Sequence, residues 1–145
     1  MAEDLLKGLK KATDIIHQES IRLVQEGSIP PPLSKKTIKN KGSSKTLIDD
    51  GWLLGALEEG IKITEDGDRL SSEIGIFDPD IAKYAAVQEY GYPAVGESDL
   101  TGFAGQRVPT RSFLRRAWDN KINEAEAALG ASVQEHMTLV FKGRR

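Results

Sequence analysis

The fold of this chain is decided by residues 61–91, which read IKITEDGDRLSSEIGIFDPDIAKYAAVQEYG. Apolar and polar residues alternate from Ile61 and again up to Ile76, on either side of an Asp66-Gly67 dipeptide. Alternation with a period of two is typical of half-buried strands, and Asp-Gly favours a two-residue hairpin turn. The first half of this stretch therefore predicts an antiparallel β-hairpin.

The second half of the stretch carries the signals that begin and end a helix. Asp78 is a capping residue, Pro79 suits the first helical position, and Asp80 places a second acid against the helix dipole. Gly91 permits the left-handed conformation in which many helices end. A helix from Pro79 to Gly91 is expected.

A long amphipathic helix is predicted before the hairpin, over Glu3–Glu26. Its apolar stripe consists of Leu5, Leu9, Ala12, Ile16 and Leu23. Gly27 is a plausible end, and the three prolines at 30–32 cannot continue a helix. A stiff proline linker of this kind can set the first helix apart from the rest of the domain.

A second long helix is predicted after the hairpin, beginning at Thr110 as a cap. Its stripe consists of Leu114, Trp118, Ile122, Ala125 and Leu129. We expect Gly130 to interrupt it. The tail fits either a helical face or a strand, and the run Thr138–Phe141 favours a strand.

The predicted fold class is α+β, with an antiparallel sheet packed by long N-terminal and C-terminal helices. A single domain of 145 residues is expected, with the helix at 1–26, a Pro/Lys-rich linker or loop at 27–48 and an α+β body at 49–145. Within the body, Asp49 or Asp50 is expected to cap a short helix that Gly60 ends. A long glycine-containing loop occupies 92–107.

Charge is distributed unevenly along the chain. Residues 1–45 carry a net charge of +4, residues 46–99 carry −10, and residues 100–145 carry +4. Such complementary regions can steer the association of subunits. The basic residues of the linker are Lys35, Lys36, Lys39, Lys41 and Lys45. They are candidates for contact with DNA phosphates or with an acidic protein face, although no aromatic side chain in the segment offers a base a stacking surface.

No pattern of residues predicts catalysis, a cofactor or a metal. Cysteine is absent, and neither His17 nor His136 has a second ligand at a metal-binding spacing, so both are interpreted as structural or surface histidines. The carboxylate pairs at 66–68 and 78–80 are explained by turn and cap chemistry. No apolar run approaches the length of a membrane span, and the acidic opening is unlike a signal peptide, so a cytoplasmic site of synthesis is expected.

Three strings in this chain resemble those of the tail-component and virion-morphogenesis family of tailed bacteriophages. Residues 47–53 (LIDDGWL) resemble "L-[IV]-D-T-G-x-L", residues 84–91 (YAAVQEYG) resemble "Y-A-x-x-x-E-[FY]-G", and residues 108–114 (VPTRSFL) resemble "[IV]-P-x-R-x-F-[LM]". All three occur in the family's order. Asp50 departs from the family, which commonly has threonine there, and this leaves open which branch of the family the chain resembles.

The resemblance implies a ring-shaped homo-oligomer, such as a hexamer, at the head–tail junction of the virion. Its expected partners are head–tail connector or adaptor proteins, tail terminator or tail tube proteins, and genomic DNA in the channel. The expected role is tail completion or head–tail joining. Two alternatives remain open, a tail terminator that caps the tail tube and a small non-viral binding module or enzyme.

Four residues are candidates for the assembly interface. Glu89 and Arg111 belong to the family-like strings, and they can pair within or between subunits if the helix ending at Gly91 packs beside the start of the helix at Thr110. Phe103 and Arg107 lie in the loop at 92–107, and a loop of this length inside a small domain is commonly functional.

Overall fold

A computed structural model of the chain describes residues 3–31, 39, 51–91 and 109–142, with side chains up to residue 138. Within these residues the fold is α+β, as predicted. The elements follow the order α1 (Glu3–Glu26), α3 (Trp52–Glu58), β1 (Ile61–Asp66), β2 (Arg69–Ile74), α4 (Pro79–Tyr90) and α5 (Phe113–Lys142).

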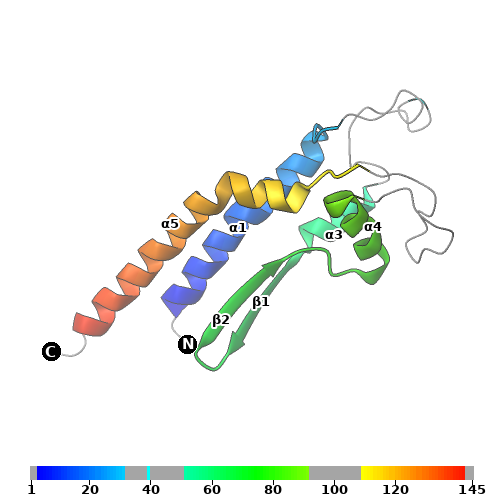
Figure 1. The fold of residues 1–145 in the computed structure, drawn as a ribbon. Coiled ribbons are helices and arrows are strands. Elements are labelled where there is room, and N and C mark those ends of the chain that lie inside the picture. The colour runs from blue at the N-terminus through cyan, green and yellow to red at the C-terminus, as the bar shows by residue number, and fades with distance from the viewer. Residues whose placement is uncertain (1–2, 32–38, 40–50, 92–108, 143–145) are drawn as a thin grey trace.

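The two long helices α1 and α5 lie side by side and run in opposite directions (Figure 1). The helix α1 has the predicted bounds, and Gly27 follows it at φ +67° with its N–H donated to the carbonyl of Leu23. The linker does not set this helix apart, and the predicted packing of the N-terminal helix in the body of the fold is confirmed. Packing against α5 and the hairpin buries Ala12 and Ile16 of its apolar stripe and partly covers the three leucines, all of which a detached helix would expose to water.

Close packing joins α1 to α5 along their length. A Cβ on Gly8 would overlap the Cβ and Oγ of Ser132, so the glycine allows the backbones to approach. Nearer the ends of the pair, a carboxylate oxygen of Asp4 lies 2.9 Å from Nδ1 of His136. Farther along, Asn120 Nδ2 donates a 3.4 Å hydrogen bond to Glu19.

The buried Glu19 carboxylate also accepts hydrogen bonds from the guanidinium of Arg22 on the same helix. These bonds hold the pKa of Glu19 below its ordinary value, against the effect of burial, and the Asn120 amide adds to the lowering. Glu19 is therefore held in its ionised form at the contact between the two helices.

The C-terminal helix corrects two expectations. Gly130 does not interrupt α5, and the run Thr138–Phe141 is helical, not a strand. The contacts at Ser132 and His136 hold this part of the helix against α1, and tertiary packing of this kind outweighs the modest strand propensity of valine and threonine. A Cβ on Gly130 would meet no atom within 4 Å, so that glycine lies at an open position.

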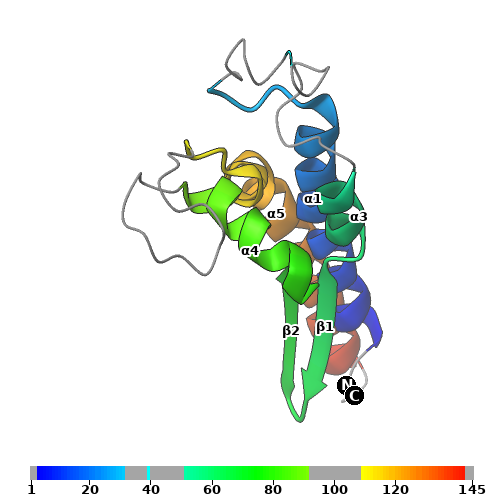
Figure 2. The same ribbon diagram turned by 90° about the vertical axis from the view of Figure 1, so that its right-hand side faces the viewer.

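The hairpin confirms the period-two pattern. Its strands pair antiparallel from Ile61 opposite Ile74 to Asp66 opposite Arg69. The two-residue turn is Gly67-Asp68, one position later than predicted, and Gly67 has φ +57°. Ile76 lies beyond the end of β2. Figure 2 shows the hairpin lying alongside α1, on one side of the α1–α5 pair.

Two glycines join the hairpin to the short helix α3. The N–H of Gly75 donates to the carbonyl of Gly60 at 2.9 Å, and a Cβ on Gly60 would overlap the Gly75 carbonyl oxygen. Gly60 ends α3 as predicted, with its N–H donated to Leu57. The N-cap of α3 is Gly51 at φ +75°, not an aspartate; Asp49 and Asp50 lie outside the described residues.

The core consists of two adjoining clusters. One lies between α1, α3, α4 and the start of α5, and the other lies along α1 and α5. His17 is buried beside the first cluster, where Nε2 donates to the carbonyl of Leu57 at 2.6 Å and joins α1 to α3. This contact agrees with the structural role predicted for that histidine.

Candidate functional site

The described parts of the three family-like strings meet in one place, although the sequence separates them widely. Each contributes a buried residue to the first core cluster: Leu53 at the start of α3, Ala85 in α4 and Phe113 at the start of α5. Phe113 and Leu53 are 0% and 3% exposed. We refer to this meeting point of α3, the end of α4 and the start of α5 as the string junction.

At the string junction, Glu89 of α4 caps the N-terminus of α5. Its two carboxylate oxygens accept hydrogen bonds from the backbone N–H groups of Leu114, at 3.0 Å, and Arg115, at 2.9 Å. The hydroxyl of Ser112 donates to the Glu89 carbonyl at 2.7 Å. A carboxylate in this position satisfies free N–H groups of the first turn and complements the helix dipole. Glu89 thus fixes the direction in which α5 leaves the junction.

The segment that precedes α5 follows the last turn of α4. The backbone N–H of Arg111 donates to the Gln88 carbonyl at 2.7 Å. Thr110, predicted as the cap of the long helix, instead donates its hydroxyl to the carbonyl of Tyr90 at 3.1 Å. The prediction of a local cap was wrong because the cap comes from another helix.

The side chain of Arg111 bonds to the backbone of Pro31 and not to Glu89. Its Nε donates to the carbonyl of Pro31 at 2.8 Å, and within the described residues no ion pair joins it to Glu89. Burial lowers the pKa of Arg111, and the nearby Tyr84 opposes this. Glu89 and Arg111 are both buried, and each connects separate elements of one chain by hydrogen bonds. Their part in assembly stays a prediction.

Most of the other predicted site residues lie outside the described residues. These are Phe103 and Arg107 of the glycine-containing loop, and Lys35, Lys36, Lys41 and Lys45 of the basic segment. Lys39 is described and exposed.

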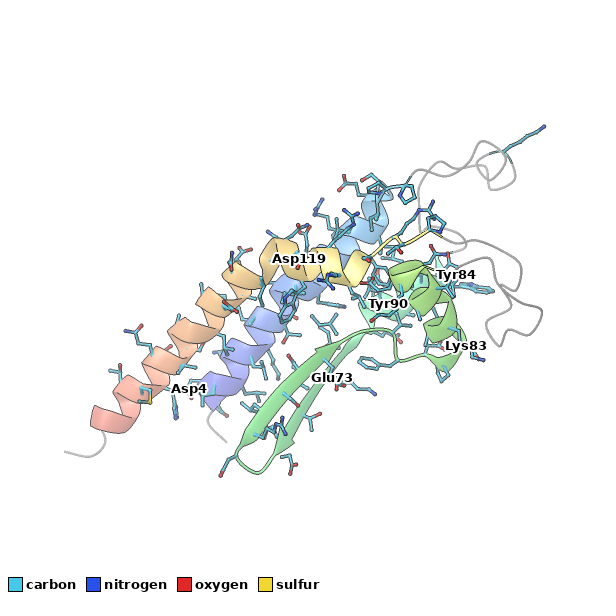
Figure 3. The ribbon with its side chains drawn as sticks, viewed as in Figure 1. Asp4, Glu73, Lys83, Tyr84, Tyr90 and Asp119 are labelled. Atoms are coloured by element: carbon cyan, nitrogen blue, oxygen red, sulfur yellow. The ribbon has the colours of Figure 1, made fainter. Side chains whose placement is uncertain are left out.

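Beside the string junction the surface exposes two large aromatic side chains. Tyr90 is 80% exposed and Trp118 is 53% exposed. Both line an open hollow of about 630 Å³, together with Thr110, Ser112, Leu114, Arg115 and Asp119. In Figure 3, Tyr90 at the end of α4 faces the first turns of α5, which carry Asp119. The sequence pattern placed Trp118 in a buried stripe and so missed this surface.

A second hollow begins at Trp118 and follows α5. It has a volume of about 450 Å³ and lies between α5, α1 and β2. Its walls are mainly apolar and include Ile16, Leu70, Ile122 and Leu129. Its polar residues include Thr13 and Ser72, and the hydroxyl of Thr13 donates a 2.7 Å hydrogen bond to that of Ser72. Trp118 and Leu114 line both hollows, so the two adjoin, and we call them together the α5 groove.

The carboxylate pairs occupy the places that turn and cap chemistry predicted. Asp78 caps α4, accepting the Asp80 N–H at 2.9 Å, and Pro79 is in the first turn. Asp66 and Asp68 flank Gly67 at the exposed end of the hairpin. Among the described residues, no group of three or more histidine and acidic side chains could hold a metal ion.

A search of the described helices for one long and apolar enough to cross a membrane found none. Comparison of the chain with family models, with curated proteins and with solved structures gave no match.

Proposed function

We propose that this chain is a structural virion protein of a tailed phage, which acts in tail completion or head–tail joining as a ring-forming neck or adaptor protein. The observation that carries the proposal is the string junction. Three strings that resemble one family in content and order also contribute to a single buried joint. Beyond this shared core, Glu89 of the second string caps the helix that the third string begins.

The exposed surface beside the junction supports a protein that works by binding. Tyr90 and Trp118 present large apolar area to solvent, and the α5 groove continues that surface along the helix. Exposed apolar patches bordered by polar side chains commonly mark protein–protein contacts, and aromatic residues dominate the energetics of such contacts. In a closed ring, many contacts of modest strength act together.

The proposed partners are further copies of the chain, connector or adaptor proteins on the head side, and tail terminator or tail tube proteins on the tail side. The rigid α1–α5 pair would hold the groove in a fixed orientation for these contacts. The contact surface then lies at the junction end of the helix pair, where Tyr90 and Trp118 are exposed.

The test is complementation of a phage that lacks the gene. A chain carrying Tyr90→Ala and Trp118→Ala should fold, because both side chains are largely exposed. Cells infected with the complemented phage should accumulate filled heads and separate tails, which electron micrographs would show. Lys83→Ala, a change of an exposed residue on α4, is the matched control and should restore infectious particles. Normal joining in the complete absence of the gene would refute the proposal.

A further inference from the structure

On the other side of α4, a third hollow combines an exposed aromatic side chain with carboxylates. Trp52, on the first turn of α3, is 70% exposed. The hollow is open, with a volume of about 790 Å³, between α3 and the start of α4. Its lining also includes Gly55, Glu59, Phe77, Asp78 and Asp80. We call it the Trp52 hollow.

The Trp52 hollow has the chemistry of a site for ammonium groups. Glu59, Asp78 and Asp80 supply three carboxylates, and none of the lining residues is basic. One ammonium already lies at its border, where Lys62 Nζ sits 4.1 Å from the centre of the Phe77 ring. Aromatic faces attract cations, and nearby carboxylates add charge attraction. Trp52 presents the larger aromatic face and has no such cation among the described residues.

The same chain carries the complementary group of charges. No acidic residue occurs between Gly27 and Ile48, and five lysines lie between positions 35 and 45. Lys39, the one of these that the structure describes, is exposed and makes no ion pair with the carboxylates of its own hollow.

We propose that the Trp52 hollow receives the lysine segment, residues 35–45, of a second copy of this chain. The two surfaces differ, so the contact is head-to-tail, and a head-to-tail contact that closes generates a ring. The inference deepens the proposed function by naming the surfaces through which copies of the chain associate.

The experiment measures association of the full-length chain by sedimentation velocity at low ionic strength. A hollow-reversed variant carries Glu59→Lys and Asp80→Lys, and leaves the capping Asp78 in place. A segment-reversed variant carries Lys36→Glu, Lys39→Glu and Lys41→Glu. Each variant alone should associate at least about tenfold more weakly than the original chain, because like charges then face one another. Circular dichroism verifies that both remain folded.

Mixing the two variants decides whether the contact joins separate copies. In the mixture each reversed surface meets an oppositely charged one, so association should return to near the original strength. A contact within one chain would give no such recovery. Glu58→Lys with Glu65→Lys is the matched control, because it changes exposed acids of α3 and β1 outside the hollow by the same charge. This control should associate as the original chain does.

Three results would overturn the inference: an original chain that stays monomeric, a hollow-reversed variant that associates normally, or a mixture that does not recover. None of these results would refute the role in virion assembly. That role fails separately, if virions are completed without the gene.

Discussion

The contact between Gly8 and Ser132 gives the most specific prediction about the stability of the fold. In Gly8→Ala the new Cβ would overlap the Cβ and Oγ of Ser132. Since Ser132 Cβ is fixed to its backbone, the overlap is relieved only if α1 and α5 move apart. Overpacking of this kind costs about 1–3 kcal/mol. Replacing glycine by alanine inside a helix returns about 1 kcal/mol.

At the upper end of that range, which suits a contact between two backbones, the net loss is about 2 kcal/mol. For a domain of this size, this lowers the midpoint of thermal unfolding by roughly 6–8 °C. The matched second change is Ser132→Gly, after which the nearest atom of residue 132 is its Cα, at 3.8 Å from the added Cβ. That distance is an ordinary contact. The free energy of unfolding of the double variant should therefore lie within about 1 kcal/mol of that of the original chain, given the helix propensities of the residues exchanged.

The assay is urea and thermal unfolding of the four proteins of this double-mutant cycle, followed by circular dichroism at 222 nm. The predicted coupling energy between the two positions is about 3 kcal/mol, because the helix-propensity terms cancel in the cycle and only the overpacking term remains. The reasoning is refuted if Gly8→Ala alone is as stable as the original chain, or if Ser132→Gly does not rescue it.

Three further predictions concern the junction, the helix contact and the hairpin. Glu89→Ala leaves two N–H groups of α5 without an acceptor and should lower the free energy of unfolding in urea by about 2–3 kcal/mol. Glu124→Gln, at an exposed position of the same helix, is the control and should lower it by under about 0.5 kcal/mol. Equal losses in the two variants would contradict the capping role of Glu89. The pKa of Glu19 is lower in the folded chain than in the unfolded one, so its contribution to stability is complete above the unfolded pKa and is lost as the pH falls through the folded pKa. Glu19→Gln should therefore flatten the fall in the free energy of unfolding between neutral and acid pH. Parallel plots of the free energy of unfolding against pH for the two proteins would exclude this. In Gly60→Ala the new Cβ would overlap the Gly75 carbonyl, which should lower the free energy of unfolding by at least about 2 kcal/mol. Gly55→Ala, whose new Cβ has no atom within 4 Å, is the control and should be neutral or stabilising. Thermal unfolding that ranks the two variants the other way would show that the Gly60–Gly75 contact does not join the hairpin to α3.

The parts of the fold that were predictable depend on local signals. Gly27 ends α1 and Asp78 caps α4 through residues adjacent in sequence, and both positions agree with the structure. The strand pattern likewise follows from alternation within a few residues. The tail of α5 was mispredicted because its helical state depends on contacts with residues near the start of the chain, such as the one between Asp4 and His136.

The candidate site shows the same division. The resemblance of the three strings rests on the sequence alone, whereas the cap that Glu89 provides to α5 joins residues 25 and 26 positions apart, and no local pattern specifies it. The exposure of Trp118 was also missed. A helical stripe does not specify which of its members a neighbouring element covers, and the hairpin leaves this one more than half exposed.

The central claim, that the chain is a component of the head–tail junction, is tested most directly by a reconstruction of the virion by electron cryomicroscopy. The account predicts a ring between head and tail whose repeating unit fits the antiparallel α1–α5 pair with the β1–β2 hairpin on one side. Purified, infectious virions that contain no copy of the chain, or that place it away from this junction, would contradict the account.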